Sequence, residues 1–268
     1  MKISDFTVGA DPEMFLIDTS TGKVISAKGI IPGKKGRPWR KGLPKGFGLE
    51  IDGILAEFNI PPCTSKGEYI ESIQFMKNFI RDFVKNINPN YDIMCKSSTE
   101  VPAEVVADPS VNEIGCAPDF NAYTMEQTVC LDHWPGLVRC AGNHIHLGIN
   151  KLRFSDRINI IKYFDLALGL KSLFSDADTE RRKLYGKAGC YRPTKYGCEY
   201  RVLSSTMLLD ENLPKVWDGI ERTIQFFNDE VPLPDSDLIQ KCINTSNLVL
   251  AEHLVKLYKD EVCVDLLA

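Results

Sequence analysis

Residues 140–149 (CAGNHIHLGI) predict a β-strand with two chemically different faces. Successive side chains of a strand point to opposite sides, so the isoleucines and the leucine share one face, while His144 and His146 share the other. A histidine pair on a sheet face can simply be held by hydrogen bonds. Gly142 and Gly148 flank the pair and permit close approach of a ligand or another backbone, which favours a site.

The first strand repeats this pattern with acids. In residues 9–16 (GADPEMFL), Asp11 and Glu13 stand two positions apart and therefore share a face of an otherwise apolar strand. An acid taken singly is most often an outward-facing, solvated group. Two acids that face a sheet interior need a cation or a hydrogen-bond donor, so we expect them to belong to the same face as the histidines.

A third polar-faced strand is predicted over residues 49–60. Glu57 and Asn59 share one of its faces, and Pro61 follows it directly. Glu50 and Asp52 precede this pair, and either could turn inward if the glycine at position 53 marks a bulge. The sequence leaves open which of the two acids contributes.

Arginine is concentrated before and within a fourth strand, predicted over residues 199–204. Glu199 and Arg201 share a face of that strand, and a glycine-rich loop precedes it. The loop contains the cations Arg181, Arg182, Lys187, Arg192 and Lys195. The planar fork of arginine makes paired bonds to phosphate, although a basic loop can equally be a solvated surface.

Together these strands offer several carboxylates, two imidazoles and a concentration of arginine. An oxygen-rich donor set with few histidines suits Mg²⁺ or Mn²⁺ better than structural zinc. Chemistry that needs both metal and arginine is phosphoryl transfer from a nucleotide. The sequence has neither a Walker A motif nor G-x-G-x-x-G, so we expect the nucleotide to be held in another way.

The remaining chain predicts an α+β fold, an antiparallel sheet with helices on one side, in a single domain over residues 1–268. Residues 5–17 and 23–28 predict a hairpin. Helices are predicted at 66–87, 155–175 and 213–228, and a strand is predicted at 138–150. A capping-box pattern precedes the first helix, and further C-terminal helices follow the last. Residues 28–48 predict a long basic loop, because they hold seven Lys and Arg, no acid, and many Gly and Pro.

Composition excludes several other classes of protein. The 268 residues are 44% hydrophobic and 25% charged with a net charge of −4, which indicates a globular chain and gives no global case for nucleic-acid or membrane binding. The acids of the first residues argue against a secretory signal. The nine cysteines are odd in number and include no C-x-x-C pair. We expect reduced thiols, a cytoplasmic protein, no nucleic-acid partner and no membrane.

The order of these motifs resembles the carboxylate–amine ligases of the glutamine-synthetase-like superfamily, which includes glutamate–cysteine ligase, and particularly a phage-associated amidoligase branch. The resemblance covers about residues 7–205. It is carried by residues 9–13 (GADPE), 57–62 (EFNIPP), 142–148 (GNHIHLG), 185–192 (YGKAGCYR) and 196–201 (YGCEYR). Asp11 is a departure, since relatives have a longer Glu there.

This resemblance implies a half-barrel sheet with helices on its convex side, whose concave face holds ATP and two or three Mg²⁺ or Mn²⁺ ions. It implies one metal on Asp11, His144 and Glu199. A second metal would be held by Glu13 and Glu57 with Asp52 or Glu50. The implied phosphate contacts are His146, Lys187, Arg192 and Arg201, of which Arg192, Arg201 and His146 would be catalytic.

The reaction implied is activation of a small-molecule or peptide carboxylate as an acylphosphate, which an amine then converts to an amide. Alternatives are a guanidino-kinase-like phosphotransferase of the same fold, a metal-dependent hydrolase that needs no ATP, and an inactive nucleotide- or peptide-binding module. A basic loop at 28–48 could fold over the site and attract an acidic substrate or nucleotide, or could be an ordinary exposed loop. A phage-encoded protein would act in the host cytoplasm, and a homo-oligomer is compatible with the sequence.

Overall fold

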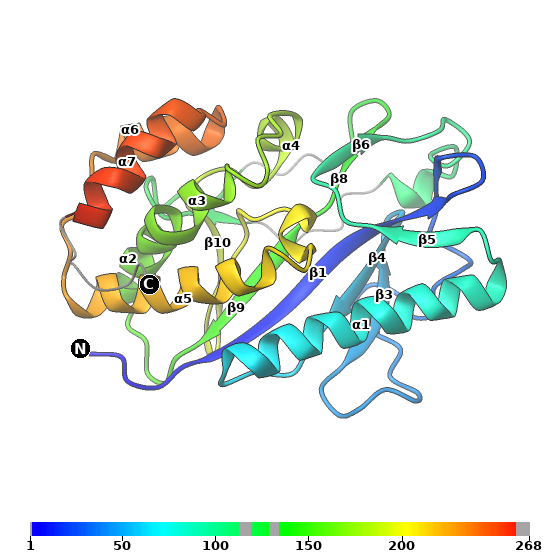
Figure 1. Ribbon diagram of the computed structural model, residues 1–268, viewed down its shortest axis with the longest axis horizontal. Coiled ribbons are helices and arrows are strands. Elements are labelled where there is room, and N and C mark those ends of the chain that lie inside the picture. Colours follow the sequence, from blue (N-terminus) through cyan, green and yellow to red (C-terminus); the bar gives the residue numbers. More distant parts are fainter. Residues whose placement is uncertain (1, 113–118, 129–133, 261–268) are drawn as a thin grey trace.

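A computed structural model of the protein describes residues 2–112, 119–128 and 134–260. Within these ranges an open antiparallel sheet has the strand order β3-β4-β1-β9-β11-β10-β7, and β2 and β5 pair with the far end of β1 (Figure 1). Its strands are β1 (Thr7–Asp18), β2 (Lys23–Ile25), β3 (Gly48–Asp52), β4 (Leu55–Asn59), β5 (Tyr91–Met94), β7 (Phe120–Asn121), β9 (Asn143–Gly148), β10 (Cys190–Thr194) and β11 (Gly197–Tyr200). The expected mixed fold with a large antiparallel sheet is confirmed.

Two further strands and the helices complete the described chain. β6 (Ser98–Glu100) and β8 (Val138–Cys140) form a separate pair. The helices are α1 (Lys66–Ile87), α2 (Phe154–Phe164), α3 (Leu170–Ser172), α4 (Glu180–Leu184), α5 (Leu213–Asn228), α6 (Ser236–Asn244) and α7 (Leu248–Asp260), with 3-10 turns η1 (Pro109–Val111) and η3 (Ser205–Leu208) and a π-helix η2 (Asp165–Gly169). None of the helices in the described part of the chain is long and apolar enough to cross a bilayer.

The predicted helix at 66–87 forms with the predicted bounds. Ser65 caps it by accepting from the backbone N–H of Glu68, whose carboxylate in turn accepts from the backbone N–H of Thr64 at 2.7 Å. Every third or fourth residue of α1, from Tyr69 to Val84, is buried. This stripe packs onto the sheet, and Tyr69 meets Trp217 of α5 with ring centroids 6.0 Å apart. Figure 1 shows α1 and α5 along the same face.

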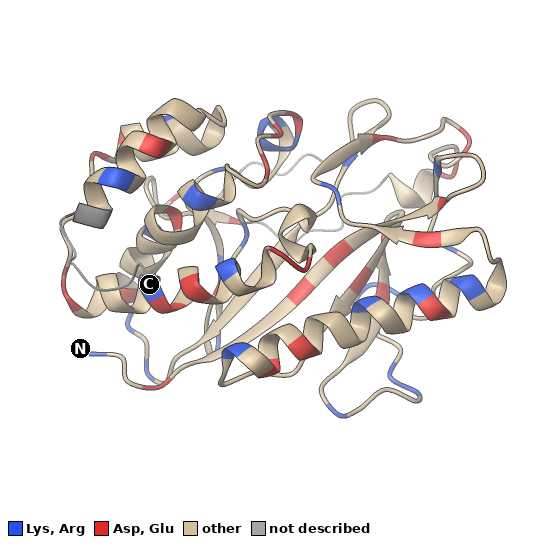
Figure 2. Ribbon diagram, viewed as in Figure 1, with Lys and Arg blue, Asp and Glu red and all other residues tan. Residues whose placement is uncertain are grey.

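Strand periodicity divides the two faces of the sheet. Val8, Ala10 and Met14 of β1 join the main core with Ile145 and Leu147 of β9. The intervening residues therefore point to the opposite face. Figure 2 shows acidic positions on β1 and on the neighbouring strands in the middle of the sheet.

Several predicted elements differ from the structure. The predicted strand at 199–204 is β11, which ends at Tyr200, and the predicted helix at 155–175 is α2 and α3 joined by the π-helix η2. The predicted strand at 49–60 is a hairpin, because Gly53, at a φ of +57°, begins a two-residue turn between Asp52 and Leu55. The predicted strand at 138–150 is interrupted at residues 141–142. The glycine-rich loop predicted before residue 199 contains α4 and β10, and β10 forms a hairpin with β11.

Candidate active site

Register brings the predicted site residues together on one face of the sheet. Asp11 of β1 lies opposite His144 of β9, and His146 lies opposite Glu199 of β11. Arg192 of β10 in turn lies opposite Glu199. Directly opposed residues of antiparallel strands project to the same side, so four strands contribute to one polar surface.

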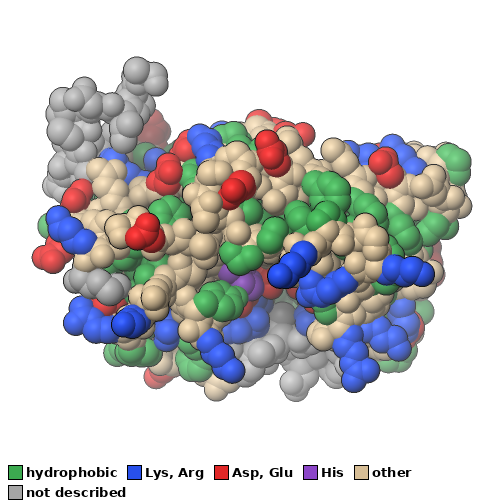
Figure 3. All heavy atoms as spheres, turned by 90° about the horizontal axis from the view of Figure 1, so that it is seen from below, with side chains coloured by type: hydrophobic (Ala, Val, Ile, Leu, Met, Phe, Trp, Pro, Cys, Tyr) green, Lys and Arg blue, Asp and Glu red, His purple; other side chains and the backbone are tan. Residues whose placement is uncertain are grey.

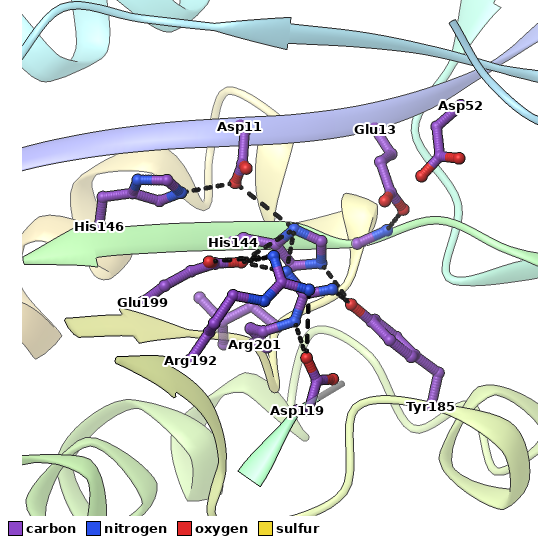
Figure 4. Close-up of polar contacts among 12 residues, drawn as sticks. Asp11, Glu13, Asp52, Asp119, His144, His146, Tyr185, Arg192, Glu199 and Arg201 are labelled. Atoms are coloured by element: carbon purple, nitrogen blue, oxygen red, sulfur yellow. Dashed lines mark hydrogen bonds and ion pairs between the residues drawn. The ribbon is translucent and has the colours of Figure 1, made fainter. Parts of the chain in front are cut away.

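A first cluster joins Asp11, His144 and Glu199. Each offers a ligand atom, and these atoms all lie within 4.8 Å of one another (Figure 4). His144 Nδ1 is 3.4 Å from a carboxylate oxygen of Asp11 and 3.8 Å from one of Glu199. His144 and Glu199 are buried, while Asp11 is partly exposed. Two carboxylates and one imidazole nitrogen can therefore surround a single cation.

A second cluster joins Glu13, Asp52 and Glu57, again with ligand atoms within 4.8 Å of one another. Glu13 lies opposite Glu57 in the sheet, and Asp52 ends β3 beside the turn. One oxygen of Glu57 is buried with no hydrogen-bond partner among the described residues. An unpartnered buried carboxylate oxygen is costly, so this cluster fits a hard divalent cation.

Gly142 explains how the two clusters approach each other. Its backbone N–H donates to Glu13 at 2.6 Å. A Cβ at this position would lie 2.6 Å from His144 Nε2, which no side chain tolerates. Glycine therefore lets the backbone reach the Glu13 carboxylate beside the His144 ring, as the sequence predicts for a close approach.

Three acids of the two clusters, Glu13, Glu57 and Glu199, have raised pKa values. Burial, with the nearby Asp52 charge second, raises the pKa of Glu13 to about 7. Burial and the Asp11 charge raise the pKa of Glu199 to about 8. Burial and the charges of Asp11 and Glu13 hold the pKa of Glu57 well above its ordinary value. Acids held this close favour protons in the absence of a cation, and a divalent cation would relieve both the burial cost and the mutual repulsion.

The two histidines differ in charge state. Burial, followed by the Arg201 charge, lowers the pKa of His144 to about 3, so its imidazole is neutral and able to act as a ligand. Burial also opposes the charged form of His146, but the Asp11 carboxylate, 2.9 Å from Nε2, outweighs it and raises the pKa. Burial would raise the pKa of Asp11, yet the two histidines together lower it.

Arg201, which directly follows β11, and Arg192 of the neighbouring β10 converge on Glu199. Arg201 is buried, and its guanidinium contacts Glu199 directly, Asp119 at 2.8 Å and His144 Nδ1 at 3.3 Å. Arg192 lies 3.3 Å from Glu199 and 3.4 Å from Asp119, with 27% of its side chain exposed. Arg192 is therefore the one of the pair that can turn toward a ligand.

Two residues join the site without having been predicted as site residues. Tyr185 follows α4, and its hydroxyl lies 3.1 Å from His144 Nε2 and also contacts Arg201. The buried carboxylate of Asp119 pairs with both arginines. Tyr185 belongs to the motif at 185–192, which could have indicated it, whereas Asp119 stands in a segment with no recognisable pattern.

Two predicted residues lie apart from the clusters. Glu50 is opposite Glu57, but it is absent from both groups of described ligand atoms. Lys187 is exposed, and no hydrogen bond or ion pair joins its side chain to either cluster within the described chain.

Comparison with known proteins gives one match to a family. Residues 135–216 match the sequence model of the phage phiEco32-like COOH.NH2 ligase-type 2 family. No curated protein matches the chain. A structure described as a novel glutamine synthase homolog aligns with 13% identity and a TM-score of 0.39, over 95% of this chain and 68% of that one. The resemblance inferred from the motifs is confirmed over residues 135–216.

Proposed function

We propose that the protein is an ATP-dependent carboxylate–amine ligase, and the match of residues 135–216 to the phage phiEco32-like COOH.NH2 ligase-type 2 family supports this proposal. The observation that carries the proposal is that two clusters of potential metal ligands and two arginines meet on one sheet face. Residues 135–216 include His144, Glu199 and Arg201. The acids of β1, β3 and β4 come from outside that range and complete the same surface.

The proposed architecture is a glutamine-synthetase-like half-barrel in a single domain over residues 1–268, with the helices on its convex side. The division of the sheet supports it, since one face packs on α1 and α5 while the other carries the polar site. The cytoplasmic location and a homo-oligomeric state remain predictions.

The proposed metal ligands follow the two clusters. Asp11, His144 and Glu199 would hold one Mg²⁺ or Mn²⁺ ion, and Glu13, Asp52 and Glu57 would hold another. The fit is supported by the unpartnered oxygen of Glu57 and by the burial that raises the pKa of Glu13. When bound, such ions neutralise the phosphates and orient the transferring group. Glu50, opposite Glu57, would support this set from beside it.

The proposed reaction has two steps. A carboxylate oxygen of the substrate attacks the γ-phosphorus of ATP, and the bond from that phosphorus to the β-phosphate oxygen breaks. ADP is released and the substrate becomes an acylphosphate. The nitrogen of the amine then attacks the acyl carbon. The bond between that carbon and the phosphate oxygen breaks, inorganic phosphate leaves, and the nitrogen loses a proton to give the amide. The chain's own contribution is to orient both substrates and to balance charge.

Arg192 and Arg201 divide the work of binding phosphate in this proposal. The partly exposed Arg192 turns from its carboxylate partners to the transferring phosphoryl group. Buried Arg201 holds Glu199 and His144 in place, and its positive charge acts on the phosphoryl group without direct contact. His146 completes the phosphate-facing set beside Asp11, and Lys187 would join it from the exposed loop.

The test is to incubate the purified protein with ATP, Mg²⁺ and a host metabolite extract, with a Glu199→Gln variant as the matched control. The proposal expects ADP and a new condensation product, detected by mass spectrometry, with the wild type only. A phosphorylated acceptor without an amide would favour a phosphotransferase instead. A product that forms without ATP would favour a hydrolase and overturn the proposal.

A further inference from the structure

The basic strap, residues 28–48, has no role in the reaction described above. It contains seven Lys and Arg and no acid, in a chain whose net charge is −4. The rest of the chain is therefore acidic, and the strap is a local reversal of sign. A reversal of this kind beside an anion-handling site raises the local concentration of negatively charged ligands.

The strap is fixed to the sheet edge and to α1. Trp39 exchanges two backbone hydrogen bonds with Leu49, at 2.7 and 3.0 Å. Its indole packs against Phe79 and Phe83 of α1 with ring centroids 6.0 and 6.4 Å apart. Phe47 packs on Phe75 in the same way at 5.1 Å. These aromatic anchors use the apolar side of the strap and hold it in one position.

A tight turn of the strap reaches the second acid cluster. The backbones of Lys34 and Arg37 exchange hydrogen bonds across the turn, and Lys35 and Gly36 form its tip. The ammonium of Lys35 contacts the carboxylate of Asp52. Lys35 is 40% exposed and Asp52 only 14%, so the ammonium stands between the cluster and solvent.

Four of the other six cations of the strap point outward, whereas Lys28 pairs with Asp108 and Arg40 donates to the Phe47 carbonyl. Lys34, Arg37, Lys41 and Lys45 are exposed, and none of them forms an ion pair within the described chain. Figure 3 shows Lys and Arg side chains distributed over one face of the molecule, with a histidine that reaches the surface. Lys34 and Arg37 flank Lys35 in the turn that contacts Asp52, so the exposed cations continue along the strap from the second cluster.

We propose that the basic strap binds an acidic peptide as the carboxylate substrate. The reacting carboxylate enters beside Lys35 at the second cluster, and neighbouring carboxylates of the peptide pair with Lys34, Arg37, Lys41 and Lys45. This inference rests on the proposed ligase function, which requires a carboxylate substrate. Several exposed cations on a fixed strap favour a ligand with several negative charges over a monoacid, since each exposed pair is weak and salt-screened.

The test measures binding of a fluorescein-labelled hexaglutamate peptide to the full-length protein by anisotropy, at two salt concentrations. The strap variant is K34Q/R37Q/K41Q/K45Q. The matched control is K2Q/K96Q/K151Q/K241Q, which removes the same charge at exposed positions outside the strap. We expect the strap variant to bind at least about tenfold more weakly with a flatter salt dependence, and the control to stay within about twofold of wild type.

A Lys35→Met variant separates the inner contact from the outer ones. We expect it to weaken hexaglutamate binding as well, and Lys35→Arg to restore part of the affinity because it keeps the positive charge. No binding by the wild type, or equal losses in the strap and control variants, would overturn the proposal. An oligothymidylate of equal charge that binds as tightly through the strap would also overturn it, in favour of a nucleic acid.

These outcomes are distinguishable from failure of the ligase function. Binding is measured without ATP, and the Glu199→Gln variant should retain it because Glu199 belongs to the first cluster. Strap-dependent binding without any ATP-dependent product would leave the surface established and the ligase assignment refuted. ATP-dependent coupling without strap-dependent binding would support the ligase assignment and refute the role of the strap.

Discussion

Asp11 and His144 face each other across β1 and β9, with the imidazole Nδ1 3.4 Å from the carboxylate. Burial and the Arg201 charge keep that imidazole neutral, so its nitrogen lone pair is available beside an ionised acid. Glu199 of β11 is the third member of this cluster. The cluster is therefore assembled by strand register, which no local segment of the chain could produce alone.

Replacing Glu199 with Gln tests this cluster. The amide keeps the size of the side chain but removes a ligand charge and the anionic partner of Arg201 and Arg192. We expect ATP turnover to fall by more than about 100-fold, since even residues behind metal ligands often cost 10–100-fold. Turnover is measured by ADP release, and thermal unfolding checks that the variant is folded. Wild-type turnover in a folded variant would refute the role of Glu199.

A matched pair of tyrosines tests the positioning of the histidines. Tyr185 contacts buried His144 at Nε2, 3.1 Å away, whereas exposed Tyr196 contacts His146 at Nδ1, 2.5 Å away. Tyr185→Phe should lower Mn²⁺ affinity by about 10–100-fold, because it frees the imidazole from its orienting partner. Tyr196→Phe should have a smaller effect. Electron paramagnetic resonance of free Mn²⁺ measures both, and equal effects would contradict the assigned difference.

Metal binding should depend on pH. The pKa of Glu13 is raised to about 7 and that of Glu199 to about 8, mainly by burial. A raised carboxyl pKa means that the group holds a proton at lower pH, and this proton must leave before a metal binds. Mn²⁺ affinity should therefore rise between about pH 6 and about pH 9, with proton release visible by calorimetry in buffers of different ionisation enthalpy. Glu13→Gln should flatten the lower part of the curve, and a flat wild-type profile would contradict the prediction.

The two arginines should respond differently to lysine. Buried Arg201 uses its whole guanidinium on Glu199, Asp119, His144 and Tyr185, and one ammonium cannot satisfy them all. We expect Arg201→Lys to cost about 1–3 kcal/mol of unfolding free energy in urea titrations. Arg192→Lys, at a partly exposed position, should cost less than about 1 kcal/mol while still raising the KM for ATP. Equal losses of stability would show that burial does not separate their roles.

Local pattern predicted most of the elements that carry the site. The cap at Ser65 and the helical spacing after it define α1, and alternation in β9 places both histidines opposite the core. β10 was missed because Pro193 and several cations hide the alternation. Pro193 is tolerated because β7 pairs only with Cys190 and Tyr191, so the outer side of β10 at position 193 is free of ladder bonds in the described sheet.

The sequence predicts which side of each strand the site residues occupy, but it does not predict which of those residues contact one another. Period two shows that Glu50 and Asp52 share a side of β3, but the hairpin turn at Gly53 decides that Asp52 reaches the second cluster. Asp119 could not be found from the sequence, because its pairing with Arg201 joins positions far apart in the chain. Pairings of this kind depend on tertiary packing, which local periodicity does not encode.

β1 carries one acid of each cluster, Asp11 and Glu13, on successive outward positions. Two residues of extended strand advance about 6.6 Å, so the backbone repeat itself sets the interval between the two cation positions. Loop mutations elsewhere could alter what enters the site without changing this interval. A single-residue insertion between Asp11 and Glu13, by contrast, would turn one of the two acids toward the core and separate the pair.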